Sequence, residues 1–330
     1  MGATFAVIGS NSFSGASFCA HLLANGFDVI GMSRSPEPHD VFLPYKWKPA
    51  NARFAFHQID INHDLERADA ILRAEKPTHI VNFAAQSMVG ESWKYPDQWM
   101  MTNVVSTVRL HERLRQYDFL DRYIHVTTPE VYGSTDDFIK EDAPFRPSTP
   151  YAVSRAAGDM SLRTYFETHG FPVVFTRSAN VYGPGQQLYR IVPRAFLFAM
   201  TGRMLELHGG GVSRRSFIHI DDVSSATLQI ALKAPAGETY HISTSEIVSI
   251  RELTERICSR AGVAFEAAVT VASERPGKDQ AYLLDSAKLR ETLGWRERID
   301  LDAGLADCHR WVTDNLSLLA GLPTSYNHKP

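Results

Sequence analysis

The fold is decided by the stretch Thr4-Phe-Ala-Val-Ile-Gly9-Ser-Asn-Ser12-Phe-Ser-Gly15 near the start of the chain. Its first five residues form a short apolar run, which is typical of a buried parallel strand. After the glycines, an apolar-periodic segment continues to Asn25-Gly26 and indicates a helix that stops there. A strand, a glycine turn and a helix N-terminus together form a unit that binds a pyrophosphate through backbone N–H groups.

The glycine turn has the spacing Gly9-x-x-Ser12-x-x-Gly15. Ser12 stands where a second glycine usually lets the backbone approach a phosphate. A tight strand-to-helix turn without a ligand would show the same two glycines, so the turn alone leaves both interpretations open. We expect a dinucleotide to contact the turn at Gly9, Ser12, Phe13 and Gly15.

Apolar runs and helical segments alternate beyond this unit. Further strands are expected at 28–33, 54–61, 78–83, 122–127, 172–177 and 240–243, and the main helices at 64–76, 98–117, 151–169, 189–201, 221–233, 250–261 and 286–293. This alternation implies right-handed crossovers and a Rossmann-type, doubly wound parallel sheet of the α/β class.

The alternation weakens after residue 177, which predicts a second, smaller domain. We expect a dinucleotide-binding domain at 1–177 plus about 219–243. A mixed α/β substrate domain is expected at about 178–218 plus 244–325, with residues 326–330 as a tail. The site should lie between the domains, at the carboxyl ends of the strands.

The end of the second predicted strand favours NADP over NAD. NAD sites commonly place an acid there to hold the ribose 2′-hydroxyl, whereas an arginine suits a 2′-phosphate. This chain has Ser33, Arg34 and Ser35. The other predicted cofactor contacts follow the third and fourth strands, where Asp60 can accept from adenine and small residues let the backbone come close; they are Asp60, Ile61, Ala84 and Gln86.

Proton-transfer groups gather between residues 127 and 155. Thr128, Glu130 and Tyr151 supply a hydroxyl, a carboxylate and a phenol, and Arg155 follows Tyr151 by one helical turn. A nearby cation favours the phenolate, so we expect Tyr151 to act as a base near neutral pH. Glu130 is a second proton-transfer group.

Composition limits the partners. The 330 residues carry a formal net charge of −3, which provides no field to recruit nucleic acid or an anionic membrane. Three cysteines without metal spacing indicate a reducing compartment, and no signal-peptide pattern or membrane span is visible. We therefore expect a cytoplasmic protein without a metal site.

Several motifs together resemble the extended short-chain dehydrogenase/reductase family, and within it the nucleotide-sugar 4,6-dehydratases that act on dTDP-glucose and GDP-mannose. The similarity covers about residues 1–315. The motifs are Asn82-Phe-Ala-Ala-Gln-Ser87, Thr102-Asn-Val104, Thr128-Pro-Glu-Val-Tyr-Gly133, Ser178-Ala-Asn-Val-Tyr-Gly-Pro184, Arg215-Ser-Phe-Ile-His-Ile-Asp-Asp222, Glu274-Arg-Pro-Gly277 and Leu293-Gly-Trp295.

The resemblance implies a lyase with a tightly bound, recycled NAD(P). Tyr151 would take the C4 hydroxyl proton of a nucleoside-diphosphate sugar, with Thr128 hydrogen-bonded to the same oxygen. Glu130 would remove the C5 hydrogen as the C6 hydroxyl leaves, and hydride would return to C6. Residues implied to hold the substrate are Ser87, Thr128, Asn180, Arg190, Arg215 and Arg275.

Three residues depart from the family pattern. Arg155 replaces a lysine, Pro129 replaces the acid that protonates the leaving hydroxyl in dTDP-glucose dehydratases, and Ser12 replaces the middle glycine. Two alternatives therefore stay open. One is an epimerase, C4 oxidase or decarboxylase that begins with the same C4 oxidation; the other is a catalytically weak NAD(P)-binding sensor or scaffold.

The helices at 98–117 and 151–169 carry more apolar and small residues than one sheet face needs. We expect them to form the interface of a homodimer, with packing inside a lone monomer as the alternative.

Overall fold

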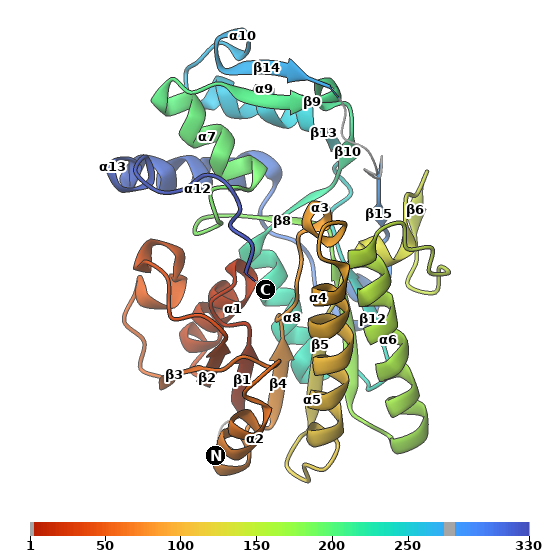
Figure 1. Ribbon diagram of the computed structural model, residues 1–330. Coiled ribbons are helices and arrows are strands. Elements are labelled where there is room, and N and C mark those ends of the chain that lie inside the picture. Colours follow the sequence, from red (N-terminus) through yellow and green to blue (C-terminus); the bar gives the residue numbers. More distant parts are fainter. Residues whose placement is uncertain (1–2, 274–280, 330) are drawn as a thin grey trace.

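The computed structural model describes residues 3–273 and 281–329, and a seven-stranded parallel sheet is its centre (Figure 1). The strand order is β12-β7-β5-β4-β1-β2-β3, and each neighbouring pair runs parallel. The strands are β1 (Thr4–Ile8), β2 (Asp28–Ser33), β3 (Phe54–Gln58), β4 (His79–Asn82), β5 (Arg122–Val126), β7 (Val173–Ser178) and β12 (Thr239–Ile242). The predicted Rossmann-type α/β fold is confirmed.

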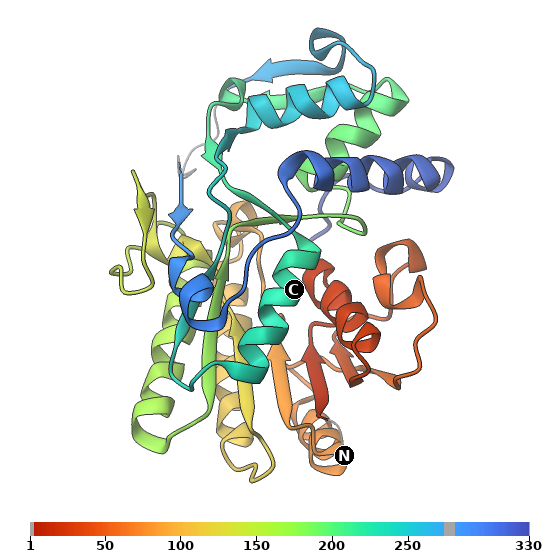
Figure 2. The ribbon, with the colours of Figure 1, turned by 180° about the vertical axis from the view of Figure 1, so that it is seen from behind.

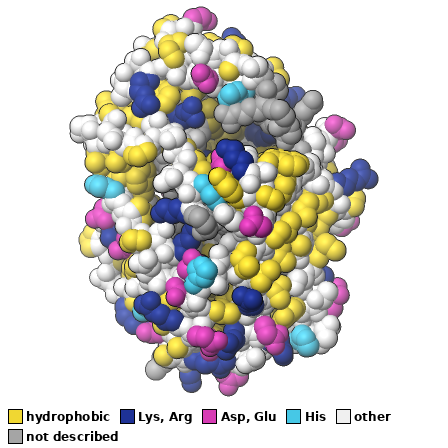
Figure 3. All heavy atoms as spheres, in the orientation of Figure 1, with side chains coloured by type: hydrophobic (Ala, Val, Ile, Leu, Met, Phe, Trp, Pro, Cys, Tyr) yellow, Lys and Arg dark blue, Asp and Glu magenta, His cyan; other side chains and the backbone are white. Residues whose placement is uncertain are grey.

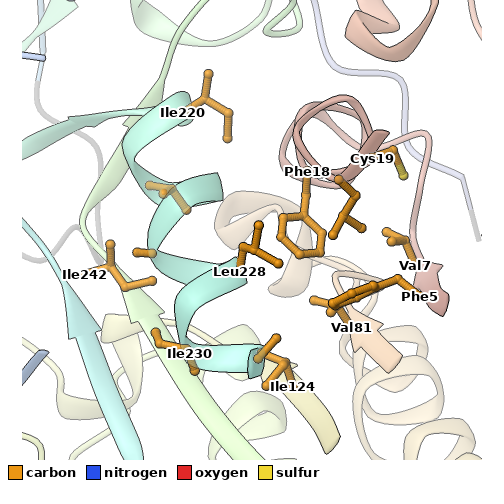
Figure 4. Close-up of a cluster of buried hydrophobic side chains, with 14 of the residues drawn as sticks. Phe5, Val7, Phe18, Cys19, Val81, Ile124, Ile220, Leu228, Ile230 and Ile242 are labelled. Carbon is orange, nitrogen blue, oxygen red and sulfur yellow. The ribbon is translucent and has the colours of Figure 1, made fainter. Parts of the chain in front are cut away.

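Helices cover both faces of the sheet (Figures 1 and 2). One face packs against α1 (Phe13–Ala24) and α8 (Ile220–Lys233), and the other against α2 (Leu65–Glu75), α5 (Thr107–Leu114) and α6 (Pro150–His169). Figure 4 shows Phe18 of α1 and Leu228 of α8 pointing toward each other above the strands. This packing fixes the N-terminus of α1 at the carboxyl end of β1.

The predicted helix at 98–117 differs from a uniform α-helix. It begins with α4 (Pro96–Met100), passes through the π-helical segment η3 (Met101–Ser106) and continues as α5. Pro96 at the first turn lacks only an N–H that would have no intrahelical partner. A π-helical segment often marks a functional position in a helix.

Two other boundaries correct the sequence prediction. Strand β3 ends at Gln58, so Asp60 lies in the following loop instead of in the strand. Helix α8 is capped by His219, whose ring accepts from the backbone N–H of Asp221, and Asp221 itself lies in the first turn.

A second hydrophobic core lies in the part of the chain after β7. It is built on α7 (Ile191–Thr201), α9 (Ile250–Arg260) and α12 (Leu301–Asp314). Helix α12 had no predicted counterpart. The remaining short elements are α3 (Val89–Ser92), α10 (Phe265–Ala268), α11 (Ala287–Leu293), α13 (Leu316–Leu319), β6 (Phe138–Ile139), β8 (Asn180–Tyr182), β9 (Leu205–His208), β10 (Arg214–Arg215), β11 (Phe217–His219), β13 (Val248–Ser249), β14 (Val269–Ala272), β15 (Leu283–Leu284), and the 3-10 turns η1 (Asp40–Phe42), η2 (Pro44–Lys46), η4 (Pro129–Tyr132) and η5 (Gly209–Gly211).

Among residues 3–273 and 281–329, no helix has the length and apolar character needed to cross a membrane. The same residues contain no cluster of three or more side chains suited to hold a metal ion.

Candidate active site

The glycine turn after β1 is a backbone cradle in which side chains do not fit. Gly9 has a φ of +87°, and a Cβ there would lie 2.8 Å from the backbone nitrogen of Ala84. A Cβ on Gly15 would lie 2.1 Å from the carbonyl oxygen of Gly9. The turn therefore needs glycine at both positions, one for its left-handed backbone and one for the close approach of helix to strand.

Ser12 has a structural reason to replace the middle glycine. It is the N-cap of α1, and its Oγ accepts from the backbone N–H of Gly15 at 3.1 Å and donates to the carbonyl of Gly9 at 2.7 Å. The side chain thus holds both ends of the turn together, and an N-cap of this kind stabilises a helix by about 1 kcal/mol.

A cavity of about 410 Å³ lies against this turn at the carboxyl ends of β1, β2 and β4. It brings together most of the predicted cofactor residues, namely Gly9, Ser12, Ser33, Arg34, Ser35, Asp60, Ile61, Ala84 and Gln86. Gly15 lies beneath the turn instead, against Gly9. The shape and the cradle fit a dinucleotide whose pyrophosphate meets the start of α1.

The end of β2 presents hydroxyls and a cation to this cavity. Ser33 Oγ accepts from the backbone N–H of Asn11 at 2.9 Å, and the side-chain amide of Asn11 donates to the carbonyl of Ser35 at 3.0 Å. These bonds tie the end of β2 to the glycine turn. Arg34 lines the cavity beside them.

A second cavity, of about 700 Å³, adjoins the first, because Ser12, Phe83, Ala85 and Gln187 line both. It gathers the predicted cofactor residue Phe13 with the predicted catalytic residues and several predicted substrate residues: Ser87, Thr128, Glu130, Tyr151, Arg155, Asn180 and Arg190. A further cavity of about 790 Å³ between α1, η2 and α8 contains none of the predicted site residues.

Thr128 and Glu130 are positioned by the turn that follows β5. Thr128 is the N-cap of η4, and its Oγ accepts from the backbone N–H of Glu130 at 3.3 Å. The Thr128 side chain also hydrogen-bonds Tyr151. Pro129 occupies the first position of η4, where its fixed φ is favourable and its missing N–H costs nothing.

Tyr151 lies in the first turn of α6, which is capped by Thr149 through a 3.1 Å bond from the backbone N–H of Ala152. Burial raises the pKa of the Tyr151 phenol to about 12, and the charge of Glu130 adds to this rise. Arg155 and the hydrogen bond to Thr128 lower the pKa only in part. Without a bound cofactor, burial therefore outweighs the expected effect of Arg155 on the pKa of Tyr151.

Arg155 points toward the sheet. Its guanidinium donates to the backbone carbonyl of Val126 at the end of β5, and the residue is buried. Burial, with the charge of Arg155 as a second cause, lowers the pKa of His111 to about 3 and that of His125 well below its usual value. Arg155 thus lies at the junction of the cavity wall and the buried histidines.

The predicted substrate residues do not all line the second cavity. Asn180 donates to the carbonyl of Ser216 at 3.3 Å, which fixes its amide at the start of β8. Arg190 is the exposed N-cap residue of α7. Arg215 is buried, and its guanidinium lies 4.4 Å over the ring of Tyr282, which lines the cavity. The predicted residue Arg275 lies outside the described residues.

The family follows from the comparison with known proteins. Residues 7–308 match the model of the family described as GDP-mannose 4,6 dehydratase. The chain belongs to this dehydratase family. It is 31% identical to the dTDP-glucose 4,6-dehydratase of Neisseria meningitidis serogroup B over 94% of this chain and 93% of the relative.

Solved structures of similar proteins agree with this assignment. The dTDP-glucose 4,6-dehydratase DesIV of Streptomyces venezuelae, solved with NAD bound, has a TM-score of 0.88 and 31% identity over 95% of this chain and 98% of its own. The UDP-glucose 4-epimerase of Thermotoga maritima, solved with UDP-glucose, has a TM-score of 0.86 and 25% identity over 95% and 99%. The resemblance inferred from the motifs is confirmed.

Within this dehydratase, each of the three departures has a local role. Ser12 caps α1, Pro129 begins η4, and Arg155 donates a hydrogen bond to the backbone carbonyl at the end of β5. None of the three moves Thr128 or Tyr151 out of the cavity.

Asn103 is a positioning residue that the sequence prediction did not place in the site. Its side-chain oxygen accepts from the backbone N–H of Gln86 at 2.9 Å, and its amide donates to the carbonyl of Gln86 at 3.0 Å and to Ser154 Oγ at 2.9 Å. It joins the loop after β4 to α6 from within η3. The motif Thr102-Asn-Val104 was the only signal for it.

Proposed function

We propose that this chain is a nucleotide-sugar 4,6-dehydratase that oxidises the sugar at C4, eliminates water across C5 and C6, and returns hydride to C6. The observation that carries the proposal is one cavity lined by Thr128, Glu130 and Tyr151, adjoining a cavity that fits a dinucleotide. The activity named for the relatives in the family supports the same reaction.

The first step belongs to Tyr151. A bound nicotinamide dinucleotide supplies the hydride acceptor for C4 and the hydride donor for C6. Tyr151 Oη takes the proton of the C4 hydroxyl, and Thr128, hydrogen-bonded to Tyr151, holds the C4 oxygen in place. The positive charge of an oxidised nicotinamide beside the phenol would lower its pKa from the high value set by burial.

The elimination belongs to Glu130. Once C4 is a ketone, the C5 hydrogen is acidic, and the Glu130 carboxylate removes it as a general base. The same carboxyl group then protonates the departing C6 hydroxyl, because Pro129 offers no acid. Glu130 thus serves as base and then as acid.

The cofactor is proposed to be NADP, although similar proteins have been solved with NAD. Ser33, Arg34 and Ser35 line the end of the cavity where a ribose 2′-group would lie. Arginine and hydroxyl donors suit a 2′-phosphate, and Asp60 is the only acid that lines this cavity among the described residues.

The substrate is proposed to be a nucleoside-diphosphate sugar. Asn180 and the arginines Arg190, Arg215 and Arg275 would hold the diphosphate, and Ser87 the sugar, as the family resemblance implies. The buried stacking of Arg215 on Tyr282 supports a role in which Tyr282 forms the wall and Arg215 supplies charge behind it.

We also propose a division into two domains and a cytoplasmic location. The core built on α7, α9 and α12 supports a substrate domain at about 178–218 plus 244–325. The three buried, free cysteines are consistent with the cytoplasm.

Incubation with a panel of nucleotide sugars tests the function. A dehydratase gives a 4-keto product that has lost the mass of one water. A product of unchanged mass and altered stereochemistry would instead indicate an epimerase, and a C4 oxidase or decarboxylase would give its own mass change. Dinucleotide binding without turnover of any sugar would indicate a sensor or scaffold.

Replacing Glu130 tests the elimination step. In Glu130→Gln, we expect water loss to fall by about 10²–10⁴-fold, because the amide cannot exchange the proton. C4 oxidation should remain, so reduced nicotinamide should accumulate, visible by absorbance. Glu206→Gln, on the exposed side of β9, is the control. Full elimination by Glu130→Gln would refute the role of Glu130.

A further inference from the structure

The segment Ser325–Lys329, here called the strap, runs beside the dinucleotide cavity, and its last residue, Lys329, lines that cavity. Figure 1 shows the chain after α13 descending from the smaller part of the molecule to the carboxyl ends of the sheet strands. Along the strap, Tyr326 and His328 are half-buried while Ser325, Asn327 and Lys329 are exposed. This alternation means that every second side chain is packed against the protein.

His328 anchors the strap to the helix beside the site. Its ring stacks on Tyr95, with centroids 5.0 Å apart and planes 5° apart, and on Trp99 at 5.2 Å and 15°. Its Nε2 lies 2.6 Å from Gln98 Oε1. Two stacked rings and a hydrogen bond hold this residue next to α4.

Tyr326 makes the second anchor. Its ring meets the edge of Tyr189 with centroids 5.2 Å apart, and Tyr189 lines the catalytic cavity. The strap therefore contacts the wall of the substrate cavity at one residue and α4 at another.

Lys329 joins the two sides of the dinucleotide cavity. Its backbone carbonyl accepts from the side-chain amide of Gln86 at 2.8 Å and from the Arg34 guanidinium at 3.0 Å. Its ammonium group donates to Ser35 Oγ at 3.1 Å. Gln86 follows β4, whereas Arg34 and Ser35 follow β2, and β1 with its glycine turn lies between those strands.

We propose that the strap is part of the cofactor site: it closes over the bound dinucleotide, and Lys329 supplies a second cation at the ribose 2′-position. The inference rests on the proposed use of NADP. Lys329 lines the cavity without filling it, since a volume of about 410 Å³ remains with Lys329 in the wall.

The chemistry of the 2′-position explains the choice of lysine. The Lys329 ammonium and the Arg34 guanidinium converge beside Ser33 and Ser35. A 2′-phosphate would accept from both cations, and such charge-assisted bonds are stronger than a bond from an ammonium to a serine hydroxyl. A ribose 2′-hydroxyl is neutral, so its hydrogen bonds to these cations would be weaker.

Release of the dinucleotide then requires the strap to lift. The contacts of Lys329 with Gln86, Arg34 and Ser35 and the stacking of His328 must all break. Slow release suits the proposed reaction, in which the hydride leaves C4 and returns to C6 in one cycle, so the cofactor ends each turnover in its starting form.

Two strap variants and a control test the proposal in the full chain. Dissociation of NADPH and NADH is followed by stopped-flow fluorescence during displacement by excess oxidised dinucleotide, and affinities by equilibrium titration. His328→Ala should speed release of both dinucleotides about tenfold or more, because it removes the main anchor. Lys329→Ala should weaken NADPH about 10–100-fold and NADH about twofold or less. Ser317→Ala, at an exposed residue of α13 outside the strap, should behave as wild type.

The outcomes distinguish a failure of the strap proposal from a failure of the proposed function. If His328→Ala releases dinucleotides at the wild-type rate, the proposal that the strap closes over the cofactor is wrong. If Lys329→Ala lowers the affinities for NADPH and NADH equally, Lys329 does not bind the 2′-phosphate. A wild-type preference for NADH overturns the NADP proposal together with the role of Lys329. A wild-type protein that binds neither dinucleotide overturns the proposed function itself. Thermal unfolding without cofactor checks that each variant is folded.

Discussion

At the scale of single residues, the charges around Tyr151 decide when it can act as a base. Its pKa lies at about 12 because burial and Glu130 outweigh Arg155. Only the phenolate accepts a proton, so the rate of C4 oxidation should rise with pH up to the pKa that Tyr151 has in the complex with cofactor.

The two neighbouring charges should shift this pH profile in opposite directions. Glu130→Gln removes a charge that raises the pKa of Tyr151, so the rising limb should move to lower pH. Arg155→Met removes a charge that lowers the pKa, so the limb should move to higher pH. Single-turnover formation of reduced nicotinamide measures both.

Arg155→Lys is the matched control for that experiment. It retains a cation, so its profile should stay close to that of the wild type. Shifts of Glu130→Gln and Arg155→Met in the same direction would contradict the electrostatic account.

At the scale of elements, the junction of β1 and α1 has no room for a side chain. In Gly15→Ala, the new Cβ would lie 2.1 Å from the Gly9 carbonyl, so strand and helix must separate. We expect a loss of about 1–3 kcal/mol in the free energy of unfolding and a large loss of dinucleotide affinity.

Gly90→Ala is the control for the glycine turn, because a Cβ at this position in α3 meets nothing within 4 Å. Urea unfolding and dinucleotide titration measure both variants. A stable Gly15→Ala protein that binds dinucleotide normally would show that the close approach of α1 to β1 is not needed.

A buried ion pair connects α6 to the sheet. Asp159 of α6 accepts from the Arg177 guanidinium of β7 at 2.8 Å and from Thr127 Oγ1 at 3.1 Å, and both charged residues are buried. Asp159→Ala would leave Arg177 charged and buried, which should cost about 3–5 kcal/mol of unfolding free energy in urea.

The surface pair Arg251–Glu255 on α9 is the comparison for Asp159. Its side chains are nearly half exposed, so Glu255→Ala should cost no more than about 1 kcal/mol. Equal losses for the two variants would mean that the buried pair contributes nothing beyond a surface contact.

At the scale of the whole molecule, one apolar face remains exposed. Figure 3 shows hydrophobic side chains gathered over α5 and α6. Met101, Val105, Val153 and Met160 on η3 and α6 are exposed in the single chain. We propose that this face forms the homodimer, because an exposed apolar patch usually marks an interface.

Met160→Glu should dissociate this dimer, because it places a charge where two apolar surfaces would meet. Light scattering coupled to size-exclusion chromatography measures the mass. Val271→Glu, at an equally exposed valine on β14, should leave the dimer intact. If the Met160→Glu protein still has the mass of a dimer, this apolar face is not the dimer interface.

The sequence predicted the parallel sheet, the glycine turn and the gathering of Thr128, Glu130 and Tyr151. These features depend on residues close together in the chain: a strand, its turn and its helix are local, and parallel strands bring their carboxyl ends to one edge. The break in the helix at η3 and the missed α12 show the limit, since both depend on packing against distant elements.

Other properties were decided only by the tertiary structure. Burial, which no local pattern reveals, reversed the expected direction of the Tyr151 pKa. The strap reaches the cofactor cavity through bonds that join Lys329 to residues 295 and 243 positions earlier. Contacts over such separations leave no periodicity in the sequence, so Lys329, predicted to lie in a tail, lines the dinucleotide cavity in the folded chain.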